Sequence, residues 1–276
     1  MRGAIHFEVV IVAAVLAVVY VAAWRAAGER IRPGRALAFG TALASLVLAL
    51  NGPLHDLAER GLFSAHMVQH LILTLVVPPL LFVGTPAFMA EAWLARPLSR
   101  PAVRAVLRAA TRPLPALAAW SVALFVWHLP GTYAAALDSH ALHFVQHATL
   151  VGAAMLGWWP IASPSRRLPA LPYAAQILYL FTFGIPMTIV AAMITGAEQV
   201  LYPIDASASR VGALTPLDDQ RLGGILMWVP AAIVPLAAFT AVFFRWVAAE
   251  WDDREDPDGT AVATSPAKPL ERGAGG

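Results

Sequence analysis

The sequence predicts an all-α integral membrane protein, a helical bundle with about seven transmembrane helices. Of the 276 residues, 59% are hydrophobic and only 13% are charged, whereas roughly 25% of residues are charged in soluble domains. The apolar residues also gather into stretches, most of them close to the roughly 20 residues that a helix needs to cross a bilayer. These stretches are residues 3–24, 36–51, 66–83, 114–130, 141–159, 173–195 and 222–246.

The first stretch, 3–24, has a second interpretation, because an apolar region after a single arginine is also compatible with a signal peptide. This stretch contains His6 and Glu8, lacks a clear small-residue cleavage site and is followed by a basic cluster. We therefore expect a retained helix.

Several of the later stretches are short or contain proline, which affects where the helices are expected to end or bend. Stretches 36–51 and 114–130 are short, and 66–83 contains Pro78 and Pro79, so their boundaries are expected to shift by several residues. Pro186 in the sixth stretch, and Pro230 and Pro235 in the seventh, predict kinks toward the bundle interior, where other groups can satisfy the freed backbone.

The basic residues predict that the N-terminus lies outside and the C-terminus in the cytoplasm. Across seven alternating spans, 15 of the 19 Lys and Arg residues fall on one side, and basic residues near span ends are retained in the cytoplasm. That side contains Arg25, Arg30, Arg32, Arg35, Arg96, Arg100, Arg104, Arg108, Arg112, Arg166, Arg167, Arg245, Arg254, Lys268 and Arg272.

The chain is expected to divide into a membrane domain, residues 1–250, and a disordered cytoplasmic tail, residues 251–276, that is acidic and then rich in Pro, Ala and Gly. Within the membrane domain, residues 36–83 and 114–159 predict a duplicated helical hairpin. Each segment has a Pro–Gly turn, at Gly52-Pro53 and at Pro130-Gly131, before a similar histidine motif.

All eight histidines are predicted to lie at or near the outer side of the membrane. They are His6, His55, His66, His70, His128, His140, His143 and His147. Four of them form two HxxQH pairs, and residues four apart in a helix lie on one face, one turn from each other. A single pair could be a polar helix end that bonds to headgroups or water. Two matching pairs favour a functional site, because ionisable groups within spans are costly.

The available donor atoms favour a metal site at the outer mouth of the bundle, with copper the preferred ion. The chain has no cysteine, which excludes thiolate sites. Imidazole suits copper, zinc and iron, and thioether sulfur favours Cu(I). The predicted ligands are His66, His70, His143 and His147, with His55, His128, His140 and Met67 as further candidates. Methionine is also an ordinary core residue.

Other polar side chains near the histidines could orient the imidazoles by hydrogen bonds. The candidates are Gln69, Gln146, Asp138 and Asp219. Asp219 has an alternative role, because an acidic residue at this position could cap the start of a helix.

Three segments together carry a resemblance to a known family. They are Phe63–Leu71 continuing through Pro78-Pro79 to Gly84-Thr85-Pro86, then Trp127-His128-Leu129-Pro130 with His143 and His147, and Asp219-Gln220 through to Trp228-Val229-Pro230. These segments resemble the CtaG family of cytochrome c oxidase assembly factors, of the Bacillus type, over roughly residues 40–246. The single-span, cysteine-containing assembly factor of the same name is a different protein, since this chain has no cysteine.

The resemblance implies a multi-pass protein of the bacterial cytoplasmic membrane that helps to mature a heme–copper oxidase by handling copper. Its implied partners are oxidase subunits and membrane lipids, without nucleic acid, and its role is delivery rather than turnover chemistry.

Two other classes of function stay open. A membrane redox enzyme could use the same histidines for a di-metal centre or as axial heme ligands, although pairs four residues apart favour compact ions. A small-molecule transporter is less favoured, because the inner halves of the spans contain almost no charged or polar residues.

Overall fold

The computed structural model describes residues 6–202 and 214–255, which contain helices and no β-strand. This confirms the predicted all-α class. The elements are α1 (Phe7–Ala26), α2 (Pro33–Leu50), α3 (Pro53–Glu59), α4 (Phe63–Leu71), the π-helix η1 (Ile72–Val76), α5 (Val77–Gly84), α6 (Ala87–Ser99), α7 (Pro101–Ala110), α8 (Pro113–Trp127), α9 (Pro130–Asp138), α10 (His140–Ala162), α11 (Tyr173–Thr195) and α13 (Pro216–Glu255).

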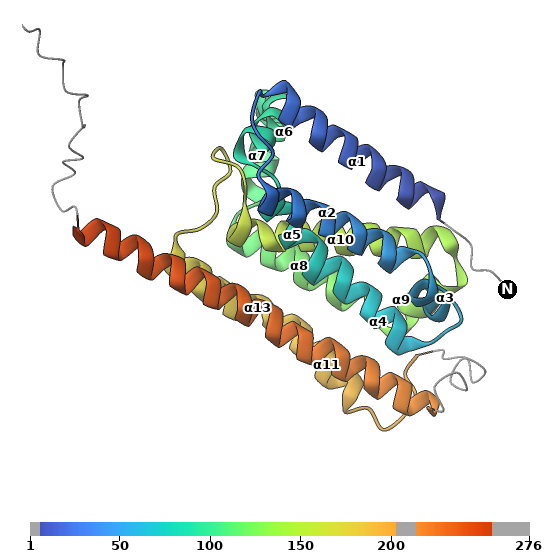
Figure 1. Cartoon of the computed structure of the whole chain (residues 1–276). Helices are drawn as coiled ribbons and strands as arrows, with labels where there is room; N and C mark the ends of the chain where they lie inside the picture. The colour runs from blue at the N-terminus through green and yellow to red at the C-terminus, as the bar shows by residue number, and fades with distance from the viewer. Residues whose placement is uncertain (1–5, 203–213, 256–276) are drawn as a thin grey trace, which may run out of the picture.

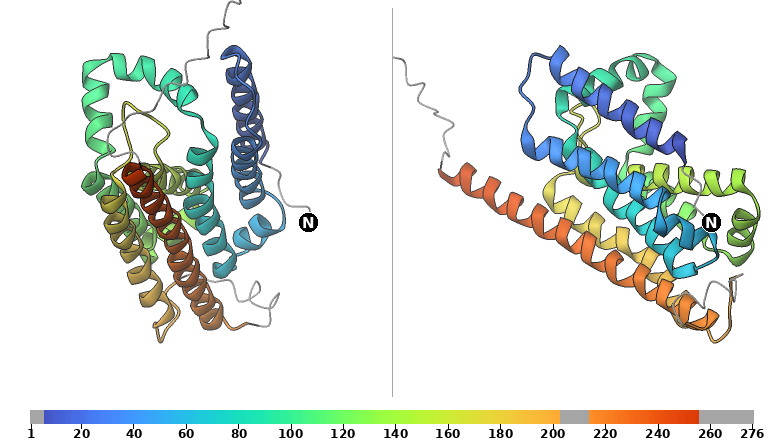
Figure 2. Two further views of the ribbon diagram at one scale, coloured as in Figure 1. Left: turned by 60° about the vertical axis from the view of Figure 1, so that its left-hand side comes forward. Right: turned by 45° about the vertical axis from the view of Figure 1, so that its right-hand side comes forward.

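The long helices run side by side as a bundle (Figure 1, Figure 2). Helix α1 lies at one edge against α2, and α11 packs along α13 at the opposite edge. The short helices α3 and α9 and the start of α4 lie together at one end of the bundle, whereas α6 and α7 lie at the other end (Figure 1). The histidine pairs therefore belong to the end that carries α3 and α9.

The apolar helices indicate a membrane protein, but the predicted number of seven spans is not confirmed. Five segments are long and apolar enough to span a bilayer, namely Phe7–Ala26, Pro33–Glu59, Phe63–Gly84, Tyr173–Thr195 and Pro216–Trp251. A sixth is added if α7 and α8, which meet at 74°, count as one span. Helix α10 is also long, with 23 residues, but His140, His143, Gln146 and His147 lower its hydropathy. The span count and the orientation stay predictions.

The third predicted span is a continuous rod in which a π-helix precedes two prolines. A proline has no N–H and its ring displaces the carbonyl four residues earlier, and a π-turn is one way to accommodate this change. The carbonyl four residues before Pro78 belongs to Thr74, and it accepts a hydrogen bond from Trp158 Nε1 of α10 at 2.9 Å. The freed backbone group thus joins this rod to α10. By contrast, α11 and α13 remain helical through Pro186, Pro230 and Pro235.

At the end opposite the histidines, Glu91 of α6 connects that helix to the loop after α10. Its Oε1 accepts hydrogen bonds from Ser165 Oγ at 2.8 Å and from the backbone amides of Arg166 and Arg167, while Oε2 pairs with Arg167 Nε at 2.7 Å. Burial would raise the pKa of the Glu91 carboxyl group, but these hydrogen bonds and the arginine charge outweigh it and lower the pKa. This contact holds α6 against the bundle.

The two predicted hairpins share an order of elements, with a short helix between two long ones. Helices α2, α3 and α4 form the first hairpin, and α8, α9 and α10 form the second. Pro53 and Pro130 begin the short helices, a position that suits proline, and each precedes the first histidine of its pair by 13 residues. This order favours the duplication, which stays a prediction. Helix α13 extends to Glu255, into the start of the predicted tail, and residues 256–276 lie outside the described part of the chain.

The orientation can be tested with reporter fusions. Because the basic residues cluster at one end of the spans, a reporter fused after residue 276 should be active only in its cytoplasmic form. A reporter inserted near Thr132, in the first turn of α9, should be active only in its exported form. The reverse pattern would place the histidines on the cytoplasmic side.

Candidate metal centre

The two histidine pairs face each other across the contact between α4 and α10. Within the pairs, the ring centroids are 4.3 Å apart for His66 and His70 and 4.5 Å apart for His143 and His147. Between the pairs, His66 lies 5.2 Å from His143 and 5.7 Å from His147, and His70 lies 5.3 Å from His147. The structure therefore brings together the four residues that the sequence singled out first.

Three of these imidazoles are buried and that of His143 is partly buried, whereas the sequence predicts a site at the outer mouth of the bundle. His66 has 0% of its surface exposed and His70 has 4%. The reason is an aromatic cover: the ring of Tyr133 from α9 lies 5.2 Å from that of His66, and Tyr202 lies 4.8 Å from Tyr133. Sequence reasoning missed both tyrosines, because nothing in their spacing relates them to the histidine pairs.

The ring nitrogens of this cluster lack protein partners among the described residues. Both nitrogens of His66 and of His70, and Nε2 of His128, His143 and His147, are buried without a hydrogen-bond partner. An unsatisfied buried polar group costs about 1–3 kcal/mol. A bound cation would satisfy several of these atoms at once, because a neutral imidazole nitrogen is a good metal ligand.

Three of the histidines have nitrogens that are close enough to share one ion. Ligand nitrogens of His66, His70 and His147 all lie within 4.8 Å of one another. With metal–nitrogen bonds of about 2.0–2.1 Å, two ligands of one ion lie roughly 3 Å apart, so small side-chain rotations would complete the geometry.

His128 lies beside this group, on the side of His70. Its ring centroid lies 5.6 Å from that of His70, and its Nδ1 lies 2.7 Å from the carbonyl oxygen of Leu124. A carbonyl can only accept, so Nδ1 carries the proton and Nε2 keeps the lone pair that a metal needs. The sequence identified His128 as a candidate, but this backbone partner appears only in the structure.

Met67 lies on a different face of α4. It is fully buried in the apolar core, and a Cβ added to Gly223 of α13 would lie 3.2 Å from Met67 Cγ. Its placement favours a packing role against α13. The predicted ligand role of Met67 therefore has no geometric support.

Gln69, Gln146 and Asp138 were expected to orient the paired histidines by hydrogen bonds, and none of the three makes such a bond in the structure. Gln69 donates from Nε2 to the Ala49 carbonyl at 2.7 Å and lies 3.1 Å from His55 Nδ1, so it contacts His55 rather than its neighbours in the pair. Gln146 is fully buried, and neither of its amide atoms has a partner among the described residues. Asp138 is exposed at the end of α9.

Asp219 caps the start of α4 and not the start of its own helix, α13, which is where its position in the sequence favoured a capping role. Its carboxylate accepts hydrogen bonds from the backbone amides of Phe63 at 2.7 Å and Ser64 at 3.2 Å. These amides begin α4 and have no partner within the helix. Asp219 thus joins α13 to the helix that carries His66 and His70.

His55 and His140 lie outside this cluster, in a second group near the bundle end. His55 Nε2 is 2.7 Å from His6 Nε2 and 3.1 Å from Glu59 Oε1, and the rings of His6 and His140 are stacked at 5.9 Å. We did not predict that His6 and Glu59 belong to a site. Glu59 is four residues after His55, a spacing that could have indicated their shared face.

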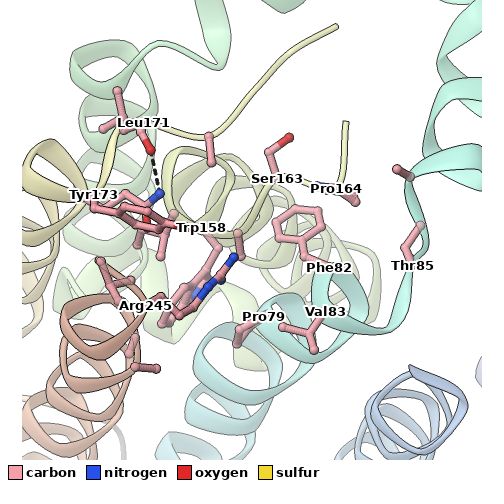
Figure 3. A pocket seen from close by; sticks show the side chains of 18 of the residues that line it. Pro79, Phe82, Val83, Thr85, Trp158, Ser163, Pro164, Leu171, Tyr173 and Arg245 are labelled. Atoms are coloured by element: carbon pink, nitrogen blue, oxygen red, sulfur yellow. Dashed lines mark hydrogen bonds between the residues drawn. The ribbon is translucent and has the colours of Figure 1, made fainter. Parts of the chain in front are cut away.

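The larger cavity of the protein lies elsewhere. A cavity of about 630 Å³ opens at the opposite end of the bundle, where residues such as Phe82, Trp158, Tyr173 and Arg245 line it (Figure 3). Its lining contains no histidine. Size alone would therefore point away from the residues that can bind a metal.

A scan against protein-family models matches residues 16–249 to the cytochrome c oxidase caa3 assembly factor (Caa3_CtaG). The chain belongs to the Caa3_CtaG family. This confirms the resemblance noted in the sequence. No match was found among curated proteins or among solved structures.

The Caa3_CtaG match contains both histidine pairs and also His55, His128 and His140, whereas His6 and Glu8 precede it. Membership gives the coarse role of the chain, assembly of a cytochrome c oxidase. It leaves the chemistry of the histidines to be argued from their geometry.

The Asp219 cap gives a testable prediction about this Caa3_CtaG protein. Asp219→Asn leaves one acceptor oxygen where two now bind the amides of Phe63 and Ser64, so thermal unfolding in detergent should shift downward, by about 1–2 kcal/mol in stability. Asp218→Asn is the matched control, because Asp218 is exposed and its carboxylate bonds locally to Thr215. Equal unfolding temperatures for the two variants would refute the capping role.

Proposed function

We propose that this Caa3_CtaG protein binds copper through the paired histidines of α4 and α10 and supplies it to a cytochrome c oxidase during assembly. The observation that carries the proposal is the meeting of two pairs whose buried ring nitrogens lack protein partners. In this proposal the site faces the outer side of the bacterial cytoplasmic membrane, and the partners are oxidase subunits within the lipid bilayer.

Copper is the proposed ion because the client, the cytochrome c oxidase that this protein helps to assemble, needs it. No sulfur ligand supports the choice. Met67 packs toward α13, so the thioether argument for Cu(I) has no support. Imidazoles alone suit copper, zinc and iron alike. Among these ions, copper is the one that a heme–copper oxidase requires as a bare ion, since its iron is held in heme.

The geometry suits storage and transfer better than turnover. Neutral imidazoles can release an ion without bond-making chemistry. The cavity of about 450 Å³ that His143 and His147 line also reaches Glu59, which is exposed, and in this proposal the ion enters and leaves along that side of α10. In this proposal copper is cargo that leaves with the client.

The main alternative is a redox metalloenzyme, and one observation favours its di-metal form: five histidines cluster where a single ion needs three or four ligands. Heme fits less well. Its two axial imidazoles approach the iron from opposite faces of a wide porphyrin, whereas the histidines of each pair lie one helical turn apart on one helix face, an arrangement that favours a compact ion. A purified sample containing iron without a heme absorption band would support the di-metal enzyme.

Alanine substitutions test whether the pairs act as one site. His70→Ala and His147→Ala should each lower the copper retained after dialysis strongly, and the double variant should lose little more, because ligands of one ion are non-additive. Copper content is measured by elemental analysis of the purified protein. Val145→Ala, on the exposed face of α10, is the control. Additive losses would indicate two separate sites, and unchanged retention in both variants would overturn the proposal.

A deletion strain tests the assembly role. The oxidase should be present in the membrane but poor in copper and inactive, and added copper should partly restore it through binding at the client's own site. The measurements are the copper-to-heme ratio of the oxidase and its activity. Because His70 and His147 are buried, their variants are scored only after immunoblotting shows normal abundance. Normal oxidase together with loss of another membrane oxidation would favour the enzyme alternative.

A further inference from the structure

We propose that His6, His55 and Glu59 form a second site that takes a divalent late first-row metal ion, with Cu²⁺ as its cargo, and loads the buried histidine cluster. The binding site stands on its own geometry. The loading role rests on the proposed function above, because it needs the buried cluster as its destination.

The three donor atoms already lie near the separations that one ion requires. His6 Nε2 is 2.7 Å from His55 Nε2, His55 Nε2 is 3.1 Å from Glu59 Oε1, and His6 Nε2 is 4.0 Å from Glu59 Oε1. Ligands bound to one ion at about 2.0–2.1 Å lie roughly 3 Å apart. Two imidazoles with a carboxylate form a mixed N,O donor set of the kind that suits Cu²⁺.

His6 is held in the protonation state that a metal ligand needs. Its Nδ1 lies 2.7 Å from Glu8 Oε1, and a carboxylate accepts, so Nδ1 carries the proton and Nε2 is free to bind. A carboxylate behind a ligand histidine is a recurrent feature of metal sites, because it fixes the ring and raises its basicity. Glu8 is therefore a positioning residue for His6.

His55 is held in the opposite protonation state, which makes the site weaker than the buried cluster. The Gln69 amide nitrogen donates to the Ala49 carbonyl and also lies 3.1 Å from His55 Nδ1. Nδ1 must then accept, so neutral His55 carries its proton on Nε2, the atom that faces His6 and Glu59. To bind a metal through Nε2, neutral His55 must carry its proton on Nδ1 instead. Gln69 must then turn its amide nitrogen away from Nδ1, because both atoms would be donors. A site that binds less tightly than its destination is what loading requires.

The exposed fractions of the three side chains and the cavity that they line indicate the order in which an ion would meet them. The side chain of Glu59 is 41% exposed, that of His6 15% and that of His55 5%, so an ion meets the carboxylate first. The cavity of about 450 Å³ is lined by these three residues and also by His143 and His147. It thus extends from the outer group to the histidine pair of α10, whereas His66 and His70 do not line it.

The test uses the full-length protein in detergent, titrated with Cu²⁺ alone. His6→Ala should remove one weakly held equivalent while the copper that resists a chelator remains. Glu8→Gln should weaken that equivalent roughly 10–100-fold, as orienting partners of metal ligands do, without changing thermal unfolding of the metal-free protein. Glu29→Gln is the matched control, because Glu29 is exposed in the loop that follows α1 at the other end of that helix. Titration curves for His6→Ala that match the wild type would overturn the site.

The relation to the buried cluster is tested separately. In the His70→Ala, His147→Ala double variant the weak equivalent should persist. If it persists while the wild type never shows chelator-resistant copper, the outer site stands and the proposed function fails.

Loading is measured as the rate at which chelator-resistant copper forms at limiting Cu²⁺. This rate should slow at least several-fold in His6→Ala. An unchanged rate would show that the outer site is not on the path.

Discussion

Helix α4 packs against α13, and its histidine rings reach those of α10, so this placement determines what each of its faces can do. The face with Phe63 and Met67 meets α13 so closely that a Cβ on Gly223 would lie 2.5 Å from the Phe63 ring. The face with His66 and His70 meets α10. The carboxylate of Asp219 holds the first turn of the helix in this position. The apolar packing residues and the histidines therefore lie on adjacent faces of one short helix.

The buried histidine cluster lowers the stability of the fold wherever its ring nitrogens have no hydrogen-bond partner. Buried imidazole nitrogens without partners cost about 1–3 kcal/mol each, and domain stabilities are only about 5–15 kcal/mol. Seven such nitrogens occur in the cluster among the described residues. Their combined cost is of the same order as a whole stability. The proposed metal therefore rests on the burial of these nitrogens more than on the HxxQH motif.

Much of this architecture could be predicted from the sequence. Composition predicted the all-α membrane bundle, and the HxxQH spacing predicted the paired histidines that α4 and α10 bring together. Helical geometry already separates Met67 from His66 by about 100°, so its different face was predictable and was overlooked. The aromatic cover from Tyr133 and the contact between His6 and His55 were not predictable. They join segments far apart in the chain, and periodicity reports which residues share a face but not which helix that face meets.

The π-helix Ile72–Val76 changes the helical phase between the two halves of one rod. A π-turn holds an extra residue, so the residues after it are rotated about the axis relative to an uninterrupted α-helix. Before it, α4 directs histidines toward α10. After it, α5 directs Gly84 toward α2, where an added Cβ would lie 2.6 Å from the backbone of Phe39. The same span can therefore present a histidine face to one neighbour and a close-packing face to another. Removing one residue from 72–76 would bring the two halves back into register and separate one of these contacts from its partner.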